Sequence, residues 1–193
     1  MDRNEFNDLG IRFQKLLDRV NEEITKKLNY HEVANDVAKQ RIVLSEDPVS
    51  EGLSSLNKKI AEVQAAKEFV SGSLMRVLAK RSTWEGLAKA GEQLYSDKQR
   101  RIIRESEAIQ NLKSEGLRIA TADAQCTDEI WLNAQIAEEV NQIDICFRIC
   151  KERAEILSSA NENLKEQTKT ISYMINIGEI ERKSLTGYDQ GVK

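Results

Sequence analysis

The chain has 193 residues, of which 32% are charged and 5% aromatic, with one proline and nine glycines. So few turn-forming residues exclude a fold built from many short strands and favour long helices. The formal net charge of −3 predicts no global attraction to nucleic acid or to an anionic membrane. The sequence has no apolar run long enough to span a membrane and no signal peptide, so we expect a cytoplasmic protein without a membrane partner.

The N-terminal region, residues 1–47, is predicted to hold two helices. Apolar residues recur at steps of three and four from Phe6 to Leu28, which predicts a helix over Asn4–Leu28. A second helix, His31–Glu46, is expected to end before the chain's only proline, because a residue that precedes proline is biased out of the helical region.

The middle region, residues 48–126, is predicted to be helical with interruptions. Ser50 is a suitable N-cap for a helix that extends to Leu78. The segment Ser82–Glu85 matches the capping-box pattern and predicts the start of another helix, which is less apolar than the one before it. A short helix over 117–124 and a turn then lead to the third region.

The third region, residues 127–193, carries the strongest pattern in the chain. Apolar residues recur at alternating steps of four and three over Ile136–Ile175, a seven-residue repeat without proline or glycine. We expect one continuous helix over Thr127–Ile177, about 75 Å long at a rise of about 1.5 Å per residue. Gly178 is expected to stop this helix, and Ser184–Lys193 is expected to be a frayed tail.

This repeat defines a seam along the helix, in which every d position is apolar and the a positions include one asparagine. A buried asparagine at an a position fixes register and oligomer state at a cost in stability. The pattern fits two arrangements equally well. In one, the seam packs against a helix of another chain, either a second copy or another helical protein. In the other, it packs against Ala90–Leu112 of the same chain in an antiparallel hairpin. The predicted interface residues are Ile136, Val140, Ile143, Phe147, Cys150, Leu157, Asn161, Leu164, Ile171 and Ile175.

A basic segment lies between Arg76 and Arg104. It holds eight cations and three acids, a local charge of +5 in a chain whose net charge is −3. Cations neutralise phosphates and aromatic rings stack on unpaired bases, so this segment predicts a surface for single-stranded nucleic acid. The alternative is a solvated helix face with salt bridges and a core tryptophan. The candidate binding residues are Lys80, Arg81, Trp84, Tyr95, Lys98, Arg100, Arg101 and Arg104.

The sequence carries no motif for catalysis or metal binding. No phosphate-binding glycine loop, GxSxG, CxxC or HExxH occurs, and the only histidine, His31, has no cysteine nearby. Cys146 and Cys150 lie one helical turn apart and are expected to be packing thiols in a reducing compartment. We therefore expect no enzyme activity, no cofactor, no metal and no small-molecule substrate.

The order of these features over residues 30–175 resembles a known family. A start at Tyr30-His31-Glu32-Val33-Ala34 is followed by the lysine-containing Leu/Ile helix Leu53–Leu78, the basic segment Lys98–Arg104 and a terminal helix with Ala154–Leu164. This layout resembles the small helical recombination mediators of tailed bacteriophages, the UvsY type. The chain differs from that family in its longer N-terminus and net negative charge.

The resemblance implies a homo-oligomer that binds single-stranded DNA and helps to load a recombinase onto strands covered by single-strand-binding protein. The residues that would carry this binding are Lys80, Arg81, Lys98, Arg100, Arg101 and Arg104.

The sequence thus predicts an all-α fold of four or five helices, in elongated hairpins or a bundle with a long C-terminal coiled-coil-forming helix. Its three regions, 1–47, 48–126 and 127–193, are expected to form one continuous helical domain. The predicted function is a non-enzymatic, oligomeric binding protein, and the resemblance implies one of the phage mediator type. The alternative is a structural or adaptor protein, such as a virion component or chaperone, that binds protein only.

Overall fold

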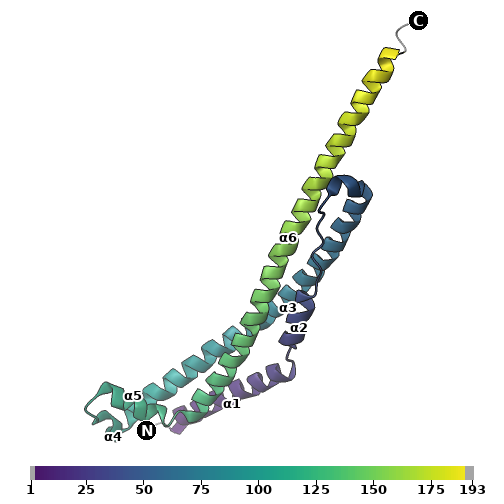
Figure 1. Cartoon of the computed structure of the whole chain (residues 1–193). Coiled ribbons are helices and arrows are strands. Elements are labelled where there is room, and N and C mark those ends of the chain that lie inside the picture. Colours follow the sequence, from purple (N-terminus) through teal and green to yellow (C-terminus); the bar gives the residue numbers. More distant parts are fainter. Residues whose placement is uncertain (1–2, 190–193) are drawn as a thin grey trace. The chain divides into compact units, whose positions relative to one another are not determined.

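The computed structural model describes the backbone of residues 3–189 and the side chains of residues 8–184. Every regular element in this part of the chain is an α-helix, so the fold is all-α (Figure 1). The long C-terminal helix is confirmed, because α6 runs without interruption over Thr127–Asp189. The other helices are α1 (Arg3–Thr25), α2 (Tyr30–Ala38), α3 (Pro48–Glu105), α4 (Glu107–Gln110) and α5 (Glu115–Asp123).

The helix α3 joins two segments that the sequence pattern separates. The expected new start at Ser82–Glu85 is wrong, because α3 passes through it in a single run of 58 residues. Val77, Trp84 and Leu87 are all buried and lie at steps of seven and three, so one apolar stripe continues through the serine. Packing of that stripe sustains the helix where local capping chemistry would allow it to end.

The second helix is shorter than expected, since α2 ends at Ala38 and not at Glu46. The segment that follows takes an irregular path, and side chains bond some of its carbonyl groups. The Lys59 ammonium donates a hydrogen bond to the Leu44 carbonyl at 3.0 Å. A segment that leaves the helix needs such replacement partners, because backbone polar groups are costly to leave unpaired.

Asp47 caps the start of α3, and the expected cap, Ser50, lies inside its first turn. The Asp47 carboxylate accepts a hydrogen bond from the Ser50 N–H at 3.3 Å, and hydrogen bonds from Ser50 lower the pKa of Asp47. Pro48 occupies the first helical position, where its missing N–H removes no intrahelical bond. Gly52 has a φ of 72°, in the left-handed region, and kinks the first turns of the helix.

The expected stop at Gly178 is also wrong, because α6 continues through it to Asp189. A glycine inside a helix costs about 1 kcal/mol relative to alanine, which is too little to end a long helix by itself. The expected frayed tail from Ser184 is therefore helical as far as Asp189. The last part of that tail, 190–193, lies outside the described residues.

The chain folds into two compact units that combine distant parts of the sequence. The first unit consists of residues 1–31 and 76–147, and the second consists of residues 32–75 and 148–193. The long helices α3 and α6 therefore each contribute to both units, whereas α1, α4 and α5 belong to the first unit alone.

In the first unit, α3 and α6 pack antiparallel. Arg81 Nε lies 2.7 Å from Asp144 Oδ1, and Lys98 Nζ lies 2.7 Å from Glu129 Oε2, so residue numbers rise on one helix as they fall on the other. Gly91 allows a close approach, because a Cβ there would clash with the side-chain oxygen of Asn133 on α6. The buried core of this unit includes Leu16, Val20, Val77, Trp84, Leu87, Leu94, Leu132, Ile136, Ile143 and Cys146.

The helix α1 completes the first unit by packing antiparallel on α3. Arg12 Nη1 lies 3.0 Å from Asp97 Oδ2, and Lys80 Nζ lies 2.7 Å from Glu23 Oε2. The short helices α4 and α5 add a further buried cluster to this unit. That cluster is formed by Ile102, Ile109, Ala122 and Cys126, with Tyr95, Ile103 and Leu112 packed against it.

In the second unit, α3 again runs antiparallel to α6. Lys67 Nζ donates a hydrogen bond to Ser158 Oγ at 3.2 Å, while Pro48, at the start of α3, shares a hollow with Ile171 and Met174 of α6. The buried core of this unit includes Val37, Leu56, Val63, Ala66, Val70, Cys150, Leu157, Ala160, Leu164 and Ile171.

We predict that Asn161→Leu stabilises the protein. Asn161 is 4% exposed, and its side-chain oxygen accepts no hydrogen bond from the described residues. Because an unpaired buried amide oxygen costs roughly 1–3 kcal/mol, the substitution should raise the free energy of unfolding by about 1 kcal/mol. Thermal unfolding followed by circular dichroism measures this change. Asn163→Leu, on the exposed side of the same helix, is the control, and a lower melting temperature for Asn161→Leu would contradict the prediction.

Candidate nucleic-acid interface

The heptad seam is filled from within the chain. All six d positions of the seam are buried, and residues of α3 lie beside them in each unit: Gly91 next to Ile136 in the first, and Pro48 next to Ile171 in the second. Of the two occupants that fit the sequence pattern, the structure therefore favours α3 of the same chain. The six buried residues are Ile136, Ile143, Cys150, Leu157, Leu164 and Ile171.

The part of α3 that faces the seam differs from the expected one. The Ala90–Leu112 segment lies mainly opposite residues that precede the seam, as its contacts with Asp123 at 2.6 Å and Glu129 at 2.7 Å show. Earlier residues of α3 face the seam itself, for example Arg81 opposite Asp144. The seven-residue repeat identifies the buried face of a helix without identifying the segment that covers it.

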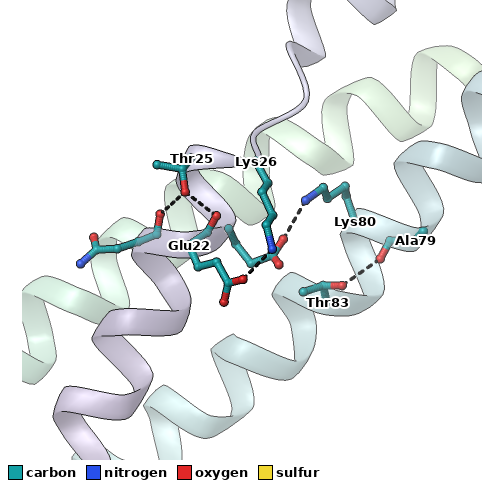
Figure 2. Close-up of polar contacts among 8 residues, drawn as sticks. Glu22, Thr25, Lys26, Ala79, Lys80 and Thr83 are labelled. Atoms are coloured by element: carbon teal, nitrogen blue, oxygen red, sulfur yellow. Dashed lines mark hydrogen bonds and ion pairs between the residues drawn. The ribbon is translucent and has the colours of Figure 1, made fainter.

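Two of the candidate cations connect α3 to its neighbours in the first unit. Figure 2 shows the Lys80 side chain reaching toward a carboxylate on α1. This carboxylate belongs to Glu23, whose Oε2 lies 2.7 Å from Lys80 Nζ. Arg81 forms ion pairs with Asp144 at 2.7 Å and Glu85 at 3.3 Å. The Arg81 guanidinium also lies 4.9 Å from the ring centroid of Phe147, within the range of a cation–π contact. Neither cation is available to a phosphate without losing these contacts.

Two further candidates, Lys98 and Arg101, are also committed inside the unit. The Lys98 ammonium lies 2.7 Å from the carboxylate of Glu129, a residue that is only 5% exposed. Arg101 is buried and its Nε lies 3.0 Å from Glu105 Oε1. Removing one partner of a buried ion pair leaves an uncompensated charge, so these contacts have a structural role.

Neither candidate aromatic residue presents a free stacking face. Trp84 is 1% exposed and anchors the core. The Tyr95 hydroxyl donates a hydrogen bond to Asp123 at 2.6 Å, and this bond together with burial raises the pKa of Tyr95 to about 12. Sequence reasoning missed Trp131, the exposed tryptophan of the first unit, because it lies outside the basic segment.

The remaining candidates, Arg100 and Arg104, are exposed. Arg104 is 70% exposed and makes only a 3.8 Å contact with Glu105, while Arg100 forms no ion pair with a described residue. Lys89 is also exposed and lies eleven residues before Arg100, which is three helical turns and therefore the same side of α3. These three cations form an exposed basic face on α3.

A second row of cations comes from α1 and was not predicted. Arg12, Lys15 and Arg19 are spaced at three and four residues, which places them on one side of the helix. They line a hollow of about 290 Å³ whose other lining residues are Leu16, Ala90, Gln93 and Leu94. No acid lines this hollow within the part of the chain that the structure describes.

The two rows belong to one surface, because Gln93 lines the hollow and lies one turn after Lys89 on the exposed side of α3. Acids adjoin this surface: Asp97 is paired with Arg12, Glu105 lies 3.8 Å from Arg104, and the Glu22 charge interacts with Arg19. We call this set the α1–α3 cationic surface. It comprises Arg12, Lys15, Arg19, Lys89, Arg100 and Arg104.

Other kinds of site find little support among the described residues. No group of three or more His, Cys, Asp and Glu side chains there is placed to hold a metal ion. Cys126, Cys146 and Cys150 are buried, and none of them is in a disulfide bond. None of the described helices combines the length and apolarity that crossing a membrane requires. Comparisons with protein-family models, curated proteins and solved structures found no match to this chain.

We predict different consequences for two neighbouring cations of α3. Lys98→Gln leaves the Glu129 carboxylate buried without its partner, so it should lower the free energy of unfolding by about 2 kcal/mol. Arg100→Gln removes an exposed charge and should change stability by less than about 0.5 kcal/mol. Urea unfolding of both variants measures the difference. Equal effects would contradict the structural role of Lys98.

We predict that two of the four tyrosines titrate late in the folded protein. Burial and the nearby Glu139 charge raise the pKa of Tyr30 to about 12, as hydrogen bonding does for Tyr95. The fold favours the neutral phenols, so their contribution to stability is complete below about pH 10 and is lost between about pH 10 and 12. The pH dependence of phenolate absorbance should show two tyrosines that ionise near pH 12. This component should be absent from the variant Tyr30→Phe/Tyr95→Phe. Titration of every tyrosine near pH 10, with helicity intact, would contradict this.

Proposed function

We propose that this protein is a non-enzymatic helical protein that binds single-stranded nucleic acid through the α1–α3 cationic surface. The observation that supports this proposal is a hollow lined by three cations of α1, with no acid among its described lining residues, beside three exposed cations of α3. Like charges that are close together repel one another, and a bound polyanion would relieve this repulsion. The phosphates of a nucleic-acid strand provide such a series of negative charges.

A single strand suits this surface better than a rigid duplex. The cations follow two antiparallel helices and the hollow has an apolar floor of Leu16 and Leu94, which a flexible strand can adapt to. Each phosphate neutralised on a single strand contributes about 0.7 to the slope of log affinity against log salt. Contacts from four of the six cations would therefore give a slope of about −3.

The finer version of this proposal is a phage-type recombination mediator. It rests on the resemblance in layout and implies an oligomer in the cytoplasm of a host cell, with single-stranded DNA and a recombinase as partners. In this version the DNA would bind to the α1–α3 cationic surface, which differs from the binding site predicted from the sequence. The surface includes cations of α1, and it does not include Lys80, Arg81, Lys98 and Arg101 of α3.

A protein-only adaptor is the second candidate function. The observation that favours it is the use of Lys80, Arg81, Lys98 and Arg101 in ion pairs within the first unit. Half of the basic segment's cations therefore satisfy acids of the same chain, as expected for a structural helix. In this version the exposed cations serve solubility alone.

Fluorescence anisotropy with a labelled single-stranded oligonucleotide tests the proposal. We predict that Lys15→Glu/Arg19→Glu/Arg100→Glu weakens binding at least about tenfold and reduces the salt slope by about 2. The variant leaves Arg101 unchanged, because a glutamate there would face Glu105 in a buried position.

The matched control is Lys58→Glu/Lys151→Glu/Lys165→Glu, which makes the same charge change at exposed positions of the second unit. It should retain most of the wild-type affinity at moderate salt. An equal loss in both variants would show binding that depends only on net charge. Absence of binding at low salt by the wild-type protein would reject the nucleic-acid proposal and favour the adaptor.

A further inference from the structure

The C-terminal part of α6 presents large apolar side chains to solvent in the second unit. Five of them within eight residues are between 45% and 68% exposed: Tyr173, Met174, Ile175, Ile177 and Ile180. The covering helix α3 begins at Pro48, which lies beside Ile171 and Met174. Figure 1 shows the yellow end of α6 continuing past the dark-blue start of α3. The intrachain partner of α6 therefore ends before these side chains do.

The exposed residues continue a heptad pattern on a second face of the helix. Thr170, Tyr173, Ile177, Ile180 and Ser184 recur at steps of three and four. With Ile177 at an a position, Tyr173 and Ile180 take d positions, and none of the three belongs to the buried seam. A heptad stripe is the pattern of a helix that packs against another helix, and an uncovered helix end is marginally stable in water.

A hollow of about 260 Å³ adjoins this stripe and extends the apolar surface. It is lined by Pro48 and Val49 of α3 together with Asn163, Glu166, Gln167, Thr170, Ile171 and Met174 of α6. Val49 is exposed, and Thr170 belongs to both the hollow and the stripe. A helix docked on the stripe could therefore place side chains in the hollow, beside the established contact of α3 with α6.

We propose that this face binds the same face of a second copy, with the two α6 ends parallel. In a parallel pair each g position faces the e position five residues further along the other helix. Lys169 would then face the partner's Met174, and Asn176 would face the partner's Glu181. No like charges meet along this stretch, so the flanks permit self-association.

The antiparallel alternative is less compatible with the charges. The register that sets Tyr173 against the partner's Ile177 would bring Lys169 close to the partner's Lys183. Isoleucine at both an a and a d position also suits parallel assemblies of more than two strands. Each added copy would bury the same stripe, as symmetric self-association requires. Oligomerisation thus occurs beyond the buried seam and does not depend on nucleic-acid binding.

Light scattering of the full chain tests this inference. The wild-type protein should have a mass of at least twice 21.9 kDa, and Ile177→Lys/Ile180→Lys should have the mass of one chain with an unchanged helical signal. The matched control, Leu117→Lys/Ile119→Lys, changes exposed apolar residues of the first unit and should remain assembled. A wild-type mass of one chain would overturn the proposal and would leave the face to a different protein. Assembly of Ile177→Lys/Ile180→Lys would also overturn it.

A cysteine at position 184 tests the orientation. In the parallel pair, Ser184→Cys places the two new thiols in one layer, so mild oxidation should link two chains. In the antiparallel register above, the same residues would lie about 27 Å apart along the helix axis, at about 1.5 Å per residue. The wild-type protein, whose thiols are buried, is the control. Assembly without this link would overturn the parallel arrangement.

Discussion

The packing of α3 against α6 is the interaction on which the rest of the structure depends. In each unit the two helices run antiparallel, and the d positions of α6 are buried. Each fully buried aliphatic side chain, such as Ile143 or Leu157, contributes about 1.5–3 kcal/mol relative to an exposed one. Because the chain itself fills this seam, a partner must bind to another face of the molecule.

The same packing decides which charges remain for function. Acids on α1 and α6, such as Glu23, Asp144 and Glu129, pair with cations of α3 in the first unit. Much of the basic segment therefore complements acids that are distant in sequence. The exposed cations of α3 include Lys89, Arg100 and Arg104, and α1 adds its own row, Arg12, Lys15 and Arg19. The candidate site is thus defined by the pairing of the helices more than by the local charge of the sequence.

The sequence pattern predicted the all-α fold, the start of α6 at Thr127 and the burial of every d position. It could not predict that α3 fills the seam, because a heptad repeat identifies a buried face and leaves its partner open. Nor could it predict that Lys98 is paired while Arg100 is exposed, because the ion pair of Lys98 with Glu129 depends on a contact between distant segments. The continuation of α3 through Ser82 was missed for a similar reason, because tertiary packing outweighed a local capping signal.

Chemical cross-linking across the α3–α6 contact tests this account most directly. Lys67 and Ser158 are in contact at 3.2 Å in the second unit, so Lys67→Cys/Ser158→Cys can be linked by a short bismaleimide. If α3 of the same chain covers the seam, the linked protein will run at the mass of one chain on a denaturing gel, even at high protein concentration. A product with the mass of two chains would show that the seam is filled between molecules and would contradict the account.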